Sequence, residues 1–157
     1  MQKITPFLWF DGNAEEAINF YTSIFRNSKI GRLTRYGKGA PVPEGSVITG
    51  TFQLDGQEFM ALNGGPLFTF SPAISLFVNC TSQEEVDYFW EKLSVGGDKS
   101  QCGWLKDKFG ISWQIIPTAL GELMGDTNPV RSMRVMQAML KMTKIDIKRL
   151  QEAYDYE

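Results

Sequence analysis

Hydrophobic and polar positions follow the same order twice along the chain. Residues 4–25 begin with a hydrophobic run, pass through Asp11-Gly12-Asn13 and continue with apolar residues at helical spacing. Residues 73–93 repeat this order, and a shift of 69 residues matches Asn13 with Ser82 and Phe20-Tyr21 with Phe89-Trp90. A half of this size cannot bury a sheet face alone. We therefore expect two βαβββ modules that close on each other, with a ligand cleft between them.

The first predicted module covers residues 3–66. Strands are expected near residues 3–10, 29–36, 46–54 and 57–63. The helix is predicted to start at Asn13, where Glu16 three residues later gives the spacing of a capping box. Asp55-Gly56 between the last two strands is typical of a two-residue hairpin turn.

The second predicted module covers residues 73–117, with strands near residues 73–79, 102–107 and 111–116. Ser82 and Glu85 form another capping box, and Gly96-Gly97 is typical of a helix end. Residues 118–157 are expected to form a helical extension of the same single domain (residues 1–157). The fold class is α+β: two βαβββ modules forming a curved, mostly antiparallel sheet with outer helices, plus C-terminal helices.

The extension has its own apolar pattern. Met133, Met136, Met139 and Leu140 recur at helical spacing, which favours a packed face, with a partner surface as the alternative. Ile145 and Leu150 flank Asp146 as a hydrophobic staple flanks an N-cap.

Composition narrows the function. The 157 residues carry a net charge of −2, which argues against a nucleic-acid partner, and no apolar run approaches membrane-spanning length. Two cysteines and no signal-peptide pattern favour a cytoplasmic protein with reduced thiols. The chain has no histidine, so Ser-His-Asp and Cys-His catalysis are excluded within one chain. A general base must be Asp, Glu, Cys, Lys or Tyr.

Several segments carry a family resemblance. The segment from Asp11 to Tyr21, the doubled βαβββ plan and the late segment from Asp107 to Gln114 resemble the vicinal oxygen chelate superfamily. That superfamily includes glyoxalase I, bleomycin resistance proteins and extradiol dioxygenases. The residues from Val135 to Ile147 resemble the tail of its PhnB-like branch, often labelled 3-demethylubiquinone-9 3-methyltransferase.

The resemblance also implies where a metal site would lie. The superfamily takes one ligand early in the first strand and one in the last strand of each half. These positions are Pro6 and a residue near Ala61 in the first half, and Ser75 and Gln114 in the second. Divalent metals favour imidazole and carboxylate ligands, so we expect no metal and no other cofactor. Methyl transfer is not expected either, because no Gly-rich loop joins a strand and helix of a doubly wound sheet.

Candidate ligand-binding residues follow from the expected cleft. They are Gln114, Ser75, Trp9, Trp104 and Cys102. Trp113 is expected to point away from Gln114, toward the helix layer, because strand neighbours face opposite ways. Gln53, Glu58 and Asn63 are weaker candidates, and Asp107 is interpreted as a turn residue.

Three functions stay open at this point. The protein is a metal-independent small-molecule binding protein, an enzyme of the superfamily that uses a carboxylate or Cys102 in place of a metal, or a protein-interaction module. Binding ranks first because an amide and a hydroxyl are unsuited to acid–base work near neutral pH. The apolar extension further predicts a homodimer.

Overall fold

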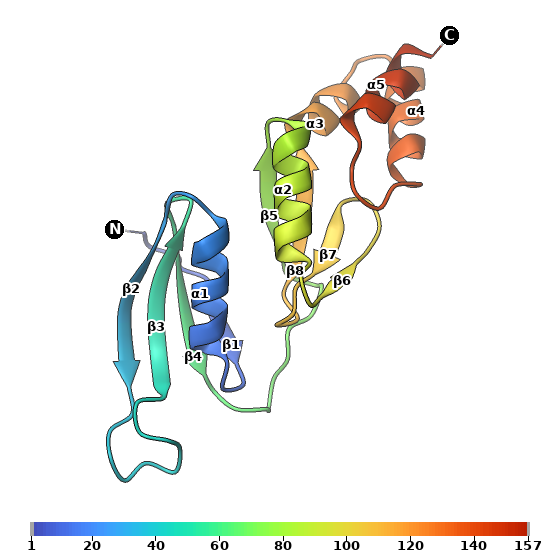
Figure 1. Cartoon of the computed structure of the whole chain (residues 1–157). Helices are drawn as coiled ribbons and strands as arrows, with labels where there is room; N and C mark the ends of the chain where they lie inside the picture. Colours follow the sequence, from blue (N-terminus) through green and yellow to red (C-terminus); the bar gives the residue numbers. More distant parts are fainter. Residues whose placement is uncertain (1, 157) are drawn as a thin grey trace. The chain divides into compact units, whose positions relative to one another are not determined.

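The computed structural model describes residues 2–156, and its chain divides into two compact units (Figure 1). The first unit ends at Phe70 and the second begins at Ser71. Each unit contains one of the predicted modules, and the C-terminal extension belongs to the second. Each is described by itself below. Among the described residues, none of the helices combines the length and apolar character needed to cross a membrane.

The first module is a four-stranded sheet with one helix on one face. Its strands lie in the order β1-β4-β3-β2, with β1 parallel to β4 and the other pairs antiparallel. The elements are β1 (Phe7–Phe10), α1 (Ala14–Ile24), β2 (Ser28–Arg35), β3 (Val47–Leu54) and β4 (Gln57–Asn63). Asp55 and Gly56 have φ values of 49° and 79°, as the predicted hairpin turn requires.

The second module repeats this arrangement in the order β5-β8-β7-β6, with β5 parallel to β8 (Figure 1). The elements are β5 (Ser75–Cys80), α2 (Gln83–Leu93), β6 (Asp98–Lys99), β7 (Trp104–Lys106) and β8 (Ser112–Pro117). The predicted α+β class with two βαβββ modules is confirmed. Each module has its own four-stranded mixed sheet.

The hydrophobic core of each module lies between its helix and its sheet. In the first module, Tyr21 of α1 stacks on Phe52 at 6.3 Å between ring centroids, and Phe52 stacks on Phe59 at 5.3 Å. In the second module, Val86, Trp90 and Leu93 of α2 are buried, as the helical periodicity predicts. These contacts leave the opposite face of each sheet without a helix of its own module, and we call it the open face.

Helices α1 and α2 are capped differently at their N-termini. Ser82 caps α2 as predicted, because its Oγ accepts a hydrogen bond from the backbone N–H of Glu85 at 3.2 Å. Asn13 is the N-cap residue of α1, so the predicted helix start is confirmed, but the predicted side-chain cap is absent. The Asn13 backbone (φ −114°, ψ 23°) lies outside the extended region of an N-cap, and its side chain makes no capping bond. Asn63 Oδ1 at the end of β4 accepts from the Ala14 N–H at 2.9 Å instead.

The extension folds into three short helices with a core of their own. They are α3 (Thr118–Met124), α4 (Pro129–Met139) and α5 (Ile147–Asp155). Their core contains Ile116, Leu120, Val135, Met142, Ile145 and Leu150. The staple around Asp146 is confirmed, since Ile145 and Leu150 are fully buried and Asp146 Oδ1 accepts from the Arg149 N–H.

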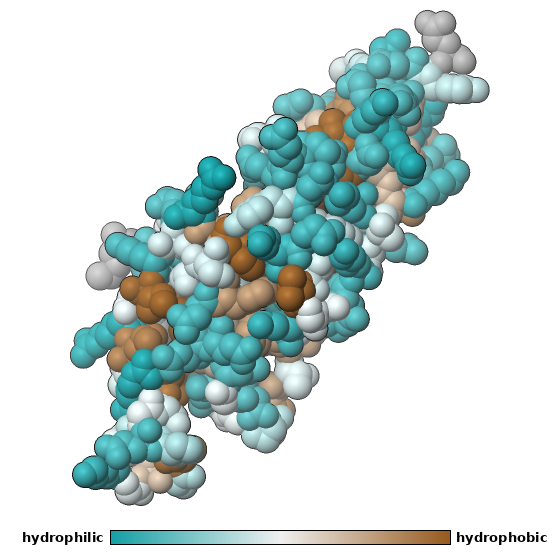
Figure 2. Space-filling model, viewed as in Figure 1, coloured by the Kyte–Doolittle hydropathy of each residue, from teal (hydrophilic) through white to brown (hydrophobic). Residues whose placement is uncertain are grey.

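The predicted methionine face is not the buried face of α4. Val135 is fully buried, whereas Met133 is 48% exposed and Leu140 54% exposed. Met139 packs only partly against the core. The helix therefore rotates its β-branched residue inward and leaves apolar side chains in solvent. Figure 2 likewise shows hydrophobic residues reaching the surface in separate patches among hydrophilic ones.

Candidate functional site

The open face of the second sheet brings three of the predicted ligand-binding residues together. Gln114 on β8 donates a hydrogen bond from Nε2 to Ser75 Oγ on β5 at 2.9 Å. Trp104 on β7 is the cross-strand partner of Gln114, so its side chain lies on the same face. All three are half-buried, and Phe77 beside them is 52% exposed. This face therefore offers an amide and a hydroxyl between two aromatic rings.

Trp113 confirms the predicted alternation of side chains along β8. Its side chain is 2% exposed, opposite to Gln114, and its Nε1 donates to Asp107 Oδ2 at 2.8 Å. Asp107 Oδ1 also accepts from the backbone N–H groups of Phe109 and Ile111. Asp107 is therefore the turn residue that the sequence predicts, and its carboxylate is fully used in holding the β7–β8 connection.

Cys102 lies in the turn before β7 rather than on a strand of this sheet. It has a φ of 59°, and its backbone N–H donates to the Met142 carbonyl at 2.8 Å. The next residue, Gly103, donates to the Thr143 carbonyl at 2.8 Å. This turn thus attaches the extension to the second sheet.

Trp9 belongs to the first module. Its Nε1 donates to the Gly65 carbonyl at 2.9 Å, and its ring meets the edge of Phe68 at 5.0 Å between centroids. A Cβ on Gly64 would lie 2.4 Å from the Trp9 ring, so glycine is required there. The segment after β4 therefore packs on Trp9, which is held as part of the first module's own structure.

The two modules match with a shift of 70 residues in their first strands but with a shift of 69 residues in their helices. The buried last residues of β1 and β5, Phe10 and Cys80, are 70 residues apart, whereas the helix starts are 69 apart. The extra residue lies in the turn at Gly12, which has a φ of 81°. In the first module, Thr5 rather than Pro6 therefore corresponds to Ser75, because a shift of one residue exchanges the faces of a strand.

The last strand needs a matching correction. Ala61 is fully buried and pairs with Gly50, where a Cβ would meet Ile18 of α1. Ala61 thus faces the helix, and Met60 takes the open-face position that matches Gln114. A threonine, a thioether, a serine and an amide do not fit a divalent metal, which favours imidazole and carboxylate. Over residues 2–156, no three His, Cys, Asp or Glu side chains gather as a metal would require.

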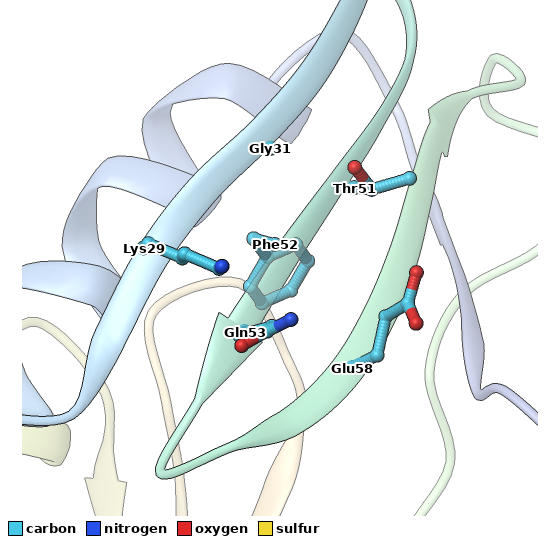
Figure 3. Close-up of a pocket in the computed structure, with 6 residues that line it drawn as sticks. All are labelled: Lys29, Gly31, Thr51, Phe52, Gln53 and Glu58. Carbon is cyan, nitrogen blue, oxygen red and sulfur yellow. The ribbon is translucent and has the colours of Figure 1, made fainter. Parts of the chain in front are cut away.

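A hollow lies on the open face of the first sheet, at the hairpin end (Figure 3). It has a volume of about 200 Å³, open to solvent, and is lined by Lys29, Gly31, Thr51, Phe52, Gln53 and Glu58. The register places Lys29 opposite Gln53 and Gln53 opposite Glu58, so these three side chains share one row across β2, β3 and β4. Gln53 and Glu58 were weaker candidates from the sequence, whereas Lys29 was missed.

Other polar residues are engaged in holding the fold. Asn63 faces α1, where it caps the helix and donates from Nδ2 to the Val47 carbonyl. Burial raises the pKa of the Cys80 thiol to about 12, so this cysteine is not a nucleophile at neutral pH. The Arg35 guanidinium bonds both oxygens of Glu15 at 2.8 Å, and this bond lowers the pKa of the Glu15 carboxyl.

Comparison with known families identifies this arrangement. The family model described as 3-demethylubiquinone-9 3-methyltransferase matches residues 2–116. The chain belongs to this family. A solved structure described as a putative 3-demethylubiquinone-9 3-methyltransferase, PhnB protein, from Bacillus cereus is 46% identical, with a TM-score of 0.70. The match covers 74% of this chain and 99% of that one. The family lies within the vicinal oxygen chelate superfamily, as the sequence predicts.

More distant structures share the fold. Protein PA1353 from Pseudomonas aeruginosa is 20% identical with a TM-score of 0.62, over 74% of this chain and 98% of that one. The fosfomycin resistance protein FosX from Listeria monocytogenes, solved with Mn(II) and sulfate, is 15% identical with a TM-score of 0.52. That match covers 72% of this chain and 90% of FosX. No curated protein matches the chain.

The family match ends at residue 116, one residue before the end of β8. The three helices of the extension lie beyond it. They share their core with Ile116, two residues from Gln114 on the same face of β8. The extension is thus built directly beside the candidate ligand-binding face.

Proposed function

We propose that this protein binds a small molecule on the open face of its second sheet, without a metal ion. The observation that carries the proposal is the hydrogen-bonded pair of Gln114 and Ser75 between Trp104 and Phe77. The pair leaves the Gln114 carbonyl oxygen, one Gln114 N–H and the Ser75 O–H to meet a ligand. The two rings supply apolar contact. A flat or apolar molecule with a carbonyl or hydroxyl group suits this set.

Binding is favoured over catalysis by the chemistry of these side chains. Neither an amide nor an aliphatic hydroxyl has a pKa near neutral pH, which an efficient general acid or base requires. The Asp107 carboxylate is bonded to Trp113 and to two backbone N–H groups, so it is not available as a base. The predicted cleft between the two modules stays a prediction, and this proposal rests on one sheet alone.

The proposed function does not include the methyl transfer that the family description names. A nucleotide-type cofactor is commonly held by a Gly-rich turn between a strand and a helix of a parallel, doubly wound sheet. Here each sheet is mixed, and the turn after β1 is Asp11-Gly12-Asn13. We expect calorimetry to detect no binding of S-adenosylmethionine. Micromolar binding would contradict this expectation.

A thermal-shift screen with divalent metals and a metabolite library tests the proposal, because a ligand selective for the native state raises the melting temperature. For a compound that does so, Gln114→Ala should weaken binding by about 1–3 kcal/mol, the cost of leaving a buried polar partner unsatisfied. Gln57→Ala removes an exposed strand glutamine of the other module and serves as the control. Unchanged affinity in Gln114→Ala, or stoichiometric metal bound at this face, would contradict the proposal.

We also propose that the protein is a homodimer. The support is the apolar surface of α4, where Val130 is 61% exposed, Met133 48% and Leu140 54%. Exposed apolar patches of this kind commonly mark an interface, and a symmetric pair buries the same patch on both copies. Light scattering should give twice the 17.7 kDa chain mass at micromolar concentration. Met133→Lys should shift the protein toward the monomer, whereas Lys148→Met on α5 should not.

A further inference from the structure

The hollow of the first sheet carries charged side chains, unlike the face proposed above. A lysine, an amide and a carboxylate stand in one row on three neighbouring strands (Figure 3). The two-residue turn at Asp55-Gly56 fixes this row, because it places Gln53 directly opposite Glu58. Neighbouring strands are about 4.8 Å apart, so the Lys29 and Glu58 backbones stand roughly 10 Å from each other.

The side chains of this row have no partners in the described part of the chain. Neither the Lys29 ammonium, the Gln53 amide nor the Glu58 carboxylate makes a hydrogen bond or an ion pair with residues 2–156. By contrast, Arg35 farther along β2 is paired with Glu15, and Lys99 of the second module with Glu91. A lysine on an edge strand commonly serves only to prevent edge pairing. That role does not explain three unpaired polar groups converging on one hollow.

The backbone of β2 brings the Thr51 hydroxyl to the edge of this hollow. Gly31 on its wall lies within an irregular stretch of the β2–β3 register. A Cβ at this position would lie 2.3 Å from Thr51 Oγ1. The same oxygen accepts a hydrogen bond from the Arg32 N–H at 2.9 Å, which leaves its own O–H free to donate. Glycine at this position therefore lets the Thr51 side chain lie against the β2 backbone, where its hydroxyl borders the row.

We propose that the Lys29–Gln53–Glu58 row binds a small zwitterion. The carboxylate of the ligand pairs with Lys29, its ammonium group pairs with Glu58, and the Gln53 amide and Thr51 hydroxyl bond its middle. Only six residues line the hollow, so the ligand that we propose is small, such as an amino acid or a dipeptide. This site is independent of the function proposed for the second sheet.

Glycylglycine is the probe that tests this proposal, by titration followed through backbone amide signals in NMR spectra. We expect saturable shifts at Thr51, Gln53 and Glu58 with a millimolar dissociation constant, as exposed ion pairs allow. N-acetylglycine lacks the ammonium group and glycinamide lacks the carboxylate, so each should bind about twofold to fivefold more weakly. Equal shifts with all three probes would overturn the proposal, as would no shift with glycylglycine.

Matched variants assign the charges. Lys29→Met and Glu58→Gln should each weaken glycylglycine binding about twofold to fivefold. Lys38→Met and Glu44→Gln remove the same charges from the exposed loop between β2 and β3 and should leave binding unchanged. The unaffected amide signals of each variant report that it is folded. If the row variants bind as the loop variants do, this hollow is not the site. Binding on the second sheet, tested through Gln114, is unaffected by that outcome.

Discussion

The two modules share one strand order and one position for the helix, yet their open faces differ in chemistry. The helix-facing sides of both sheets are apolar, with Phe52 and Phe59 in the first and Leu105 and Trp113 in the second. The open face of the first carries a cation, an amide and a carboxylate at its hairpin end. That of the second carries a serine–glutamine pair between aromatic rings. The shared fold thus constrains the buried face, and function differs where packing does not decide.

The modules also differ in how corresponding elements are held. The first module closes its β3–β4 connection with the exposed two-residue turn Asp55-Gly56 and caps its helix from the distant Asn63. The second closes its β7–β8 connection around the buried Asp107 and caps its helix from the neighbouring Ser82. The first module therefore caps its helix through a long-range bond, whereas the second uses local bonds both for its helix cap and for its strand connection. Substitutions at matching positions should have unequal effects.

The largest difference is expected at the two strand connections. Asp107→Ala removes the acceptor of three hydrogen bonds and leaves buried N–H groups unsatisfied, so the free energy of unfolding should fall by about 3–5 kcal/mol. Asp55→Ala changes an exposed residue and should cost at most about 1 kcal/mol, since alanine tolerates positive φ poorly. Urea unfolding of both variants measures this. Equal losses would mean that the Asp107 network does not hold the turn.

A smaller difference is expected at the helix starts. Asn63→Ala should cost about 1–3 kcal/mol, because it removes both the bond to the Ala14 N–H and the bond to the Val47 carbonyl. Ser82→Ala should cost about 1 kcal/mol, the usual value for a lost N-cap. Asn13→Ala should have little effect, since its side chain makes no capping bond. If Asn13→Ala lost as much free energy of unfolding as Ser82→Ala, the Asn13 side chain would cap α1 locally, as the sequence favours.

Local patterns were sufficient to predict most of the fold. The duplicated order, the capping signal at Ser82, the turn at Asp55-Gly56 and the staple around Asp146 depend on residues within a few positions of one another. These features needed no knowledge of how distant segments meet. The meeting of Gln114 and Ser75 is different, because the two residues are 39 positions apart on paired strands, and it was predicted from the family resemblance.

What the sequence missed depends on distant contacts or on a single residue. Asn63 caps a helix that begins 49 positions earlier, so no local pattern indicates it. One extra residue in the turn at Gly12 moves the strand equivalence from Pro6 to Thr5 and exchanges the faces. Part of the Lys29–Gln53–Glu58 row could be predicted from the sequence, because the hairpin turn places Gln53 opposite Glu58. Its third member, Lys29, could not, because the register between β2 and β3 is irregular. The orientation of α4 is set by the core around Val135.

The smallest effect is expected at an ion pair that joins the extension to α2 of the second module. Lys144 Nζ lies 2.8 Å from Asp87 Oδ1 of α2, and Gln83 also bonds this carboxylate. These bonds hold the pKa of Asp87 below its ordinary value. A carboxyl whose pKa is lower in the folded state stabilises that state above the unfolded pKa, and this stability is lost as pH falls through the folded pKa.

Lys144→Met should therefore lower the free energy of unfolding at pH 7 by less than about 1 kcal/mol, because the pair is largely exposed to solvent. The difference from the unsubstituted protein should shrink as the pH is lowered from 5 toward 2, where Asp87 becomes protonated in both states. Urea unfolding across this pH range measures the difference. Lys99→Met, which breaks the exposed pair with Glu91, provides a control away from the extension. A loss in Lys144→Met that is independent of pH would indicate that Lys144 acts through packing of its methylene groups rather than through its charge.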